Sequence, residues 1–253
     1  PFRNTGKDTG SEVTHDGMKH FSRYVLAGGI ALYIMILGGV SLARHHQFQT
    51  QAYDMGVFSQ TFWNTARGRV MENSLESAGT HWGVHMSPFL LFLVPLYVVA
   101  PSPYTLLLLQ TAALALGALP LFLLARRLLG NESRAAGIAA AYLLYPSLHW
   151  VQVFDFHAIT FFVPLFFAAW YFFIEERWRL SALFFILAAL TKETAAIAVA
   201  VSMFAIAWMR WRAGKPYAWY IAAGVSAGIY VFLTLSWFMP AMGGGFLFSE
   251  RYK

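Results

Sequence analysis

The chain has 253 residues, of which 58% are hydrophobic, 17% are aromatic and 12% are charged. Because the charged fraction is about half that of ordinary soluble domains, we exclude a water-soluble globular protein. The net charge of +6 does not indicate nucleic-acid binding, since the basic residues lie at the ends of apolar segments rather than among exposed aromatic residues, and the lack of cysteine excludes disulfides and thiolate metal sites.

The apolar segments predict an all-α membrane protein, a polytopic bundle of about seven transmembrane helices. A helix needs about 20 apolar residues to cross the hydrocarbon core of a bilayer. Residues 1–22 are polar and are expected to form a cytoplasmic tail, and residues 23–253 are expected to form a single transmembrane module. The expected spans are 24–43, 104–125, 135–150, 158–174, 180–190, 194–208 and 217–239.

The distribution of Lys and Arg predicts the orientation of these spans, because cytoplasmic loops of membrane proteins are enriched in both residues. On this map 12 of the 18 Lys and Arg residues fall on the side of the N-terminus. We therefore expect a multi-pass protein of the cell (inner) membrane with a cytoplasmic N-terminus. The residues on that side are Arg3, Lys7, Lys19, Arg23, Arg126, Arg127, Arg134, Arg177, Arg179, Arg210, Arg212 and Lys215.

The longest polar interval, residues 44–103, is expected to form a large outer loop with helices that lie on the membrane surface. Asp54 is followed by apolar residues at helical spacing, which indicates such a helix. Asp is also a favoured N-cap, here for a helix beginning at Met55. The apolar segment 88–100 has only 13 residues and contains Pro95, so we expect it to be re-entrant or interfacial rather than spanning.

The candidate chemical groups are ionisable side chains on the expected outer side. The Asp54 carboxylate could accept a proton from a hydroxyl group or hold a metal ion. His81 and His85 are four residues apart, a helical metal-pair spacing that leaves a divalent metal open as a cofactor, against simple interfacial hydrogen bonding. Asp155 and His157 lie on a very apolar loop, where ionisable residues are commonly functional. The alternative there is an Asp-to-His pair that stabilises the turn.

Lys192 and Glu193 interrupt the apolar run 180–208, which is too long for one comfortable span. The run is either a helical hairpin with this pair at its outer tip, or one tilted helix with the pair buried. In the hairpin, the Lys192 ammonium group faces the lipid headgroups and could hold a phosphate. A snorkelling lysine would explain the residue equally well.

Several segments together carry a resemblance to a known family. They are YDMGVFSQTFWN, HWGVHMSPFLLFLVPLYVVAPSPYTLLLLQ, YLLYPSLHWVQVFDFHA, LTKETAA and the closing RY. These segments, over residues 49–252, resemble the DUF2079-type predicted membrane protein family of bacteria and archaea. That family is similar in layout to the GT-C superfamily of membrane glycosyltransferases, whose seven-helix module carries a catalytic acid in the first outer loop. The variable C-terminal part of such enzymes is expected to be missing from this chain.

The resemblance implies a glycosyltransferase that uses a polyprenyl-phosphate-linked sugar on the outer leaflet. Asp54 matches the catalytic acid, and Lys192 matches the basic residue of an LxTK segment that would hold the phosphate. The other residues implied to bind substrate or metal are Glu193, Asp155, His157, His81 and His85.

The alternative is a non-catalytic membrane subunit that keeps this fold and acts in assembly or lipid binding with other membrane protein subunits. The single Asp54 favours it, because Ser59 stands where the superfamily commonly has a second acid. A transporter is the third hypothesis and ranks last, because no inverted repeat is evident in the sequence.

Overall fold

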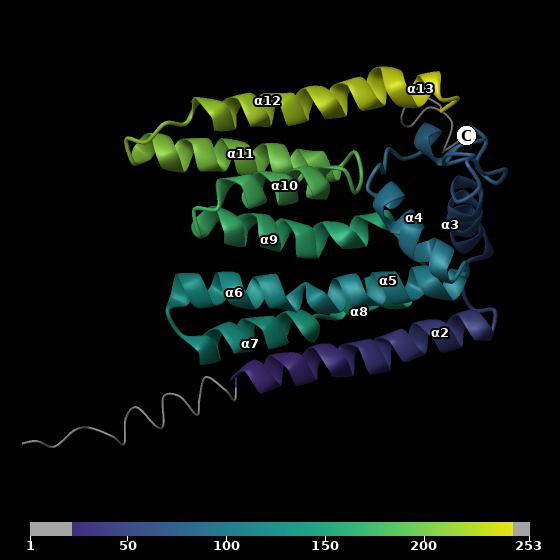
Figure 1. Ribbon diagram of the computed structural model, residues 1–253, viewed down its shortest axis with the longest axis horizontal. Coiled ribbons are helices and arrows are strands. Elements are labelled where there is room, and N and C mark those ends of the chain that lie inside the picture. The colour runs from purple at the N-terminus through teal and green to yellow at the C-terminus, as the bar shows by residue number, and fades with distance from the viewer. Residues whose placement is uncertain (1–21, 245–253) are drawn as a thin grey trace, which may run out of the picture.

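Long helices run side by side between two ends of the molecule in the computed structural model, which describes residues 22–244 (Figure 1). The described residues form no β-strand, and only an isolated bridge joins Glu72 and Thr80. The predicted all-α class is therefore confirmed. In chain order the elements after the start of the first helix are η1 (Ile34–Gly38), α2 (Gly39–His46), α3 (Ala52–Thr65), η2 (His81–Gly83), α4 (Leu90–Val99), α5 (Pro103–Leu116), α6 (Ala118–Leu129), α7 (Glu132–Leu143), α8 (Pro146–Val153), η3 (Ala158–Phe161), α9 (Phe162–Ile174), α10 (Trp178–Ala189), α11 (Ala195–Arg212), α12 (Ala218–Leu233), η4 (Thr234–Phe238) and α13 (Met239–Ala241).

Four helices in the described part of the chain are long and apolar enough to cross a membrane, namely Ser22–His46, Pro103–Leu129, Ala195–Arg212 and Ala218–Ala241. The other predicted spans are shorter. The helices α9 and α10 have 13 and 12 residues, and the predicted span 135–150 is divided into α7 and α8 because Pro146 begins a new helix. The count of seven spans stays a prediction.

The chain turns sharply between α10 and α11, at residues 190–194. The two helices are antiparallel in Figure 1, with Lys192 and Glu193 in the connection between them. The hairpin interpretation of the apolar run 180–208 is therefore correct, and the single tilted helix is wrong.

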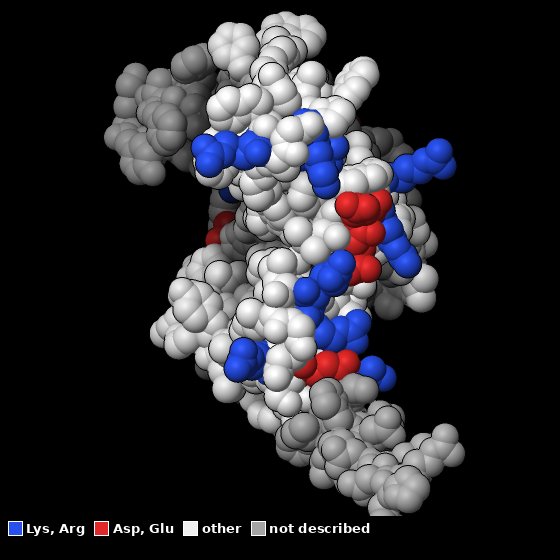
Figure 2. All heavy atoms as spheres, turned by 90° about the vertical axis from the view of Figure 1, so that its left-hand side faces the viewer, with Lys and Arg blue, Asp and Glu red and all other residues white. Residues whose placement is uncertain are grey.

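One end of the bundle, which we call the basic end, carries the connections α6–α7, α9–α10 and α11–α12. Lys and Arg side chains gather over this end in Figure 2. They are partly neutralised by ion pairs, with Arg126 3.2 Å from Glu132 and Arg127 2.9 Å from Glu175. This distribution agrees with the predicted charge asymmetry.

The opposite end, which we call the site end, carries α3, α4 and the connections α8–η3 and α10–α11 (Figure 1). The helix α3 runs across the ends of the long helices and begins at Ala52, not at the predicted Met55. Asp54 therefore lies in the first turn and is not the N-cap, which is Gln51. The helix α4 has 10 residues with Pro95 inside it, too few to cross a bilayer, in line with the prediction for this segment.

A hydrophobic core holds the site end together. Phe62 of α3 packs against Tyr97 of α4 and against Phe156, with ring centroids 5.3 and 5.8 Å apart. Phe62 and Phe156 are almost completely buried, as is Leu106 of α5. The position of α3 is thus set by packing against segments that lie far away in the sequence.

Candidate functional site

A polar cavity of about 140 Å³ lies at the site end, between α3, the η2 loop and the connections after α8 and α10. Five of the seven residues predicted from the sequence line it together: Asp54, His81, His85, His157 and Lys192. Its remaining lining residues are Tyr53, Val57, Phe58, Glu76, Ser87, Ala158 and Ile159. Groups that are scattered over the chain therefore meet in one small space.

Asp54 and Lys192 are the acid and the cation of this cavity that have no partner in residues 22–244. No hydrogen bond or ion pair from the described residues reaches either side chain. Asp54 projects from the first turn of α3 and Lys192 from the α10–α11 connection. Within the described part of the chain, both charges are therefore available to a ligand in the cavity.

His81 is held by a carboxylate that the sequence analysis missed. Its Nδ1 lies 3.1 and 3.2 Å from the two carboxylate oxygens of Glu76, and both side chains are buried. Asn73 Nδ2 donates to Glu76 Oε2 over 2.7 Å, and the His81 backbone N–H donates to Met71 O over 2.8 Å. Glu76 belongs to an irregular loop, so no helical or strand periodicity marked it.

His85 is held in the same way by Glu193, with 3.1 Å between Nδ1 and Oε1. Glu193 does not line the cavity itself, and its second oxygen accepts the Met86 backbone N–H over 3.0 Å. Burial lowers the pKa of His85 more than the bond to Glu193 raises it, and the nearby Lys192 ammonium lowers it further. The pair is thus a neutral imidazole that donates a hydrogen bond to a carboxylate.

The carboxylate of Glu193 is the ionised member of this pair. Burial is the largest single influence and raises the pKa of Glu193, but the hydrogen bond from His85, a backbone hydrogen bond and the electrostatic influence of His85 and Lys192 together lower it below its ordinary value. The predicted metal-pair arrangement on one helical face is not formed, because His81 and His85 lie on a 3₁₀ turn and the residues after it. Their ring centroids are 5.9 Å apart.

Asp155 lies behind the cavity wall and holds the beginning of α3. Its Oδ2 accepts the backbone N–H of Gln51, the N-cap residue, over 2.8 Å. Burial raises the pKa of Asp155, the bond from Gln51 lowers it, and the neighbouring Asp54 carboxylate raises it. The predicted pairing of the Asp155 and His157 side chains is not formed, since His157 Nδ1 donates instead to the Asp155 carbonyl oxygen over 2.9 Å.

Gln110, a second residue that the sequence analysis missed, shapes the loop that carries His157. Its side chain is fully buried in α5. Its Oε1 accepts the His157 backbone N–H over 2.8 Å, and its Nε2 donates to the carbonyl oxygens of Asp155 and Val151 over 3.3 and 3.4 Å. A lone amide in the apolar stretch LLLLQTAAL was the signal that could have identified it.

The described residues contain no group of three or more His, Asp or Glu side chains arranged to hold a metal ion. The metal alternative for His81 and His85 therefore finds no ligand set in residues 22–244. The nitrogen and oxygen atoms of the cavity are instead arranged as separate hydrogen-bonding groups.

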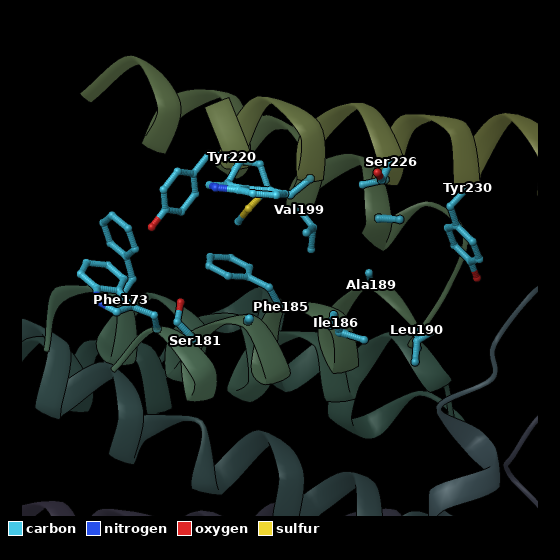
Figure 3. Close-up of a pocket in the computed structure, with 17 residues that line it drawn as sticks. Phe173, Ser181, Phe185, Ile186, Ala189, Leu190, Val199, Tyr220, Ser226 and Tyr230 are labelled. Carbon is cyan, nitrogen blue, oxygen red and sulfur yellow. The ribbon is translucent and has the colours of Figure 1, made fainter. Parts of the chain in front are cut away.

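An apolar groove of about 540 Å³ lies between α9, α10, α11 and α12 and shares no lining residue with the polar cavity. Figure 3 shows Phe173 and Tyr220 at one end of it and Leu190 and Tyr230 at the other. Leu190 is two residues before Lys192 in the chain. The groove therefore ends at the connection whose lysine lines the polar cavity.

No curated protein and no solved structure matches the chain, so the GT-C resemblance stays a prediction. Residues 44–252 match the family described as predicted membrane protein DUF2079. This range includes every residue that lines the polar cavity and the apolar groove. A match over most of the chain, with helices long and apolar enough to cross a bilayer, assigns the protein to the DUF2079 family of predicted membrane proteins.

Proposed function

We propose that the protein transfers a sugar from a polyprenyl-phosphate carrier to an acceptor hydroxyl group on the outer leaflet of the cell membrane. The observation that carries the proposal is that the Asp54 carboxylate and the Lys192 ammonium group, neither paired with any residue of 22–244, meet in one cavity. Glycosyl transfer from a lipid phosphate needs a group that accepts the proton and a group that stabilises the leaving phosphate.

The two side chains divide the reaction between them. The acceptor oxygen attacks the anomeric carbon, and the bond between that carbon and the phosphate oxygen breaks, so the electron pair leaves with the phosphate. Asp54 takes the proton of the acceptor hydroxyl, a role that contributes about 10²- to 10⁴-fold in comparable reactions. Lys192 stabilises the charge on the departing phosphate.

We propose the apolar groove as the binding site for the hydrocarbon chain of the carrier. It is lined almost entirely by aromatic and aliphatic side chains, and it ends beside the connection that carries Lys192. A lipid whose phosphate contacts Lys192 could therefore place the first part of its chain between α10 and α12. Burial of each CH₂ group there contributes about 0.8 kcal/mol if the alternative is water, and much less if it is the bilayer.

The charges at the two ends of the bundle support the orientation in this proposal. The basic end faces the cytoplasm according to the positive-inside rule, so the site end faces the outer leaflet. The described Lys and Arg residues at the site end are Arg44, Arg67, Arg69 and Lys192, fewer than at the basic end.

The assignment of Asp54 is tested by sugar transfer in reconstituted vesicles, with undecaprenyl phosphates carrying different hexoses as donors and a membrane extract as the acceptor source. We expect Asp54→Asn to lower the transfer rate by about 10²-fold or more. The matched control is Glu72→Gln, which removes an exposed carboxylate from the same outer loop and should leave the rate unchanged. Equal rates for the wild type and Asp54→Asn would refute the assignment.

The proposed lipid-binding site is tested separately, by measuring the binding of undecaprenyl phosphate and of undecaprenol to the protein in nanodiscs. We expect Lys192→Met to reduce the preference for the phosphate, and Ala227→Trp, which fills the groove, to weaken binding of both lipids. Ala222→Trp makes the same change at an exposed position of α12 outside the groove and should have no effect. Lipid binding without transfer by the wild type would instead favour the non-catalytic subunit.

A further inference from the structure

Three imidazoles around the polar cavity share one hydrogen-bonding arrangement. The Nδ1 atoms of His81, His85 and His157 each lie against an oxygen that accepts: the Glu76 carboxylate, the Glu193 carboxylate and the Asp155 carbonyl. Because a carbonyl or carboxylate oxygen can only accept, each Nδ1 carries the proton. In a neutral imidazole the other nitrogen, Nε2, is then an acceptor.

His81 gives the strongest evidence that these Nε2 atoms bind a ligand. Its side chain is 2% exposed, it lines the cavity, and its Nε2 is buried with no hydrogen-bond partner among residues 22–244. Leaving a buried polar atom unpaired is unfavourable. Since Glu76 occupies Nδ1, Nε2 is the atom left to meet whatever the cavity holds.

We propose that His81, His85 and His157 form a sugar-hydroxyl binding face, in which each Nε2 accepts a hydrogen bond from a hydroxyl group of the ligand. Unprotonated Nε2 atoms disfavour an anion, the more so at His81 and His85, whose Nδ1 atoms are backed by carboxylates, so this face takes a neutral, hydroxyl-rich group. Lys192 is the cation among the described lining residues and takes the phosphate. The inference rests on the proposed function and assigns the orientation of the ligand: sugar toward the histidines, phosphate toward Lys192.

The chain contains an internal contrast for testing this arrangement. His149 lies outside the cavity, and its Nε2, not its Nδ1, is 2.6 Å from a carbonyl oxygen, that of Leu143. His149 must therefore carry its proton on Nε2. The tautomer of the three cavity histidines is thus the opposite of the tautomer of His149 in the same molecule.

The experiment is nitrogen NMR of the full chain in nanodiscs at neutral pH, with isotope-labelled histidine and with signals assigned by single His→Gln variants. We expect the Nδ1–H tautomer for His81, His85 and His157 and the Nε2–H tautomer for His149. Free D-glucose or D-mannose should move the Nε2 signals of the cavity histidines and leave His149 unchanged. Inorganic phosphate, which is expected to bind Lys192 beside His85, should not move the Nε2 signals of His81 and His157.

Either of two results would overturn the proposal: a proton on Nε2 of His81 in the unliganded protein, or no movement of any cavity Nε2 signal by either hexose. A further comparison uses Glu76→Gln, which should weaken the tautomer preference of His81, and Glu72→Gln, which removes an exposed carboxylate and should not. These spectra do not depend on transfer. A correct tautomer with hexose binding, combined with full activity of Asp54→Asn, would refute the proposed function and leave this inference standing.

Discussion

Replacing Gln110 by Met removes the amide that positions the His157 loop while keeping the length of the side chain. The His157 backbone N–H, 2.8 Å from Gln110 Oε1, loses its partner, and the carbonyl oxygens of Asp155 and Val151 lose longer bonds of 3.3 and 3.4 Å. Hydrogen bonds between membrane helices average about 0.6 kcal/mol, because the unfolded chain in the membrane finds other partners. A stranded buried backbone N–H costs more, about 1–3 kcal/mol. We therefore expect Gln110→Met to lower the free energy of unfolding by about 2 kcal/mol.

The assay is unfolding in mixed micelles by increasing fractions of denaturing detergent, followed by the fluorescence of the nine tryptophans. Gln51→Met is the matched control, because Gln51 is exposed and uses its backbone N–H, not its side chain, in the contact with Asp155. The control should change stability by less than about 0.5 kcal/mol. Equal unfolding curves for the two variants would refute the view that Gln110 holds the loop.

Two further predictions concern Gly83 and His85. A Cβ at Gly83 would clash with Ala78 Cβ, so Gly83→Ala should lower the free energy of unfolding by about 1–3 kcal/mol. A Cβ at Gly137, in the middle of a helix, meets nothing within 4 Å, so Gly137→Ala should cause no loss. Equal losses for the two variants in the same assay would contradict this. Burial lowers the pKa of folded His85 below its ordinary 6.5, so its contribution to stability is complete above pH 6.5 and is lost as the pH falls through the folded pKa. Unfolding measured over this window should show a weaker pH dependence for His85→Gln, and an unchanged slope would show that another group titrates. The lowered pKa of Glu193 adds a separate loss only below 4.5.

Part of the candidate site could be read from local features of the sequence. Asp54 stood out because it opens an amphipathic segment in the longest polar interval. Lys192 stood out because it interrupts an apolar run, where an ionisable side chain is unfavourable. The hairpin at Lys192 was one of two interpretations, and the length of the run could not decide between them. The structure decided it, because the chain turns sharply at residues 190–194, so that α10 packs against α9 and α11 packs against α12.

The supporting residues of the site were not predictable in this way. Glu76 has no local pattern that separates it from ordinary polar residues. Gln110 stood out only as a lone amide in an apolar stretch, and neither residue's partners across the fold could be read from the sequence. Asp155 was singled out, but its partner, the backbone of Gln51 at the start of α3, could not be foreseen. Hydrogen-bond partners far apart in the chain are set by packing, which a single sequence does not reveal.

The amino-acid sequence by itself determined that this is a helical membrane protein with a charged end, because apolar content and the spacing of basic residues act locally and are governed by the bilayer. It also singled out Asp54, Lys192 and the histidines as candidates. Only the tertiary structure decided that these side chains share one cavity, and which nitrogen of each imidazole is free. Those properties depend on distances of a few ångströms between distant segments, and such distances are set when α3 and the connecting loops pack across the ends of the long helices.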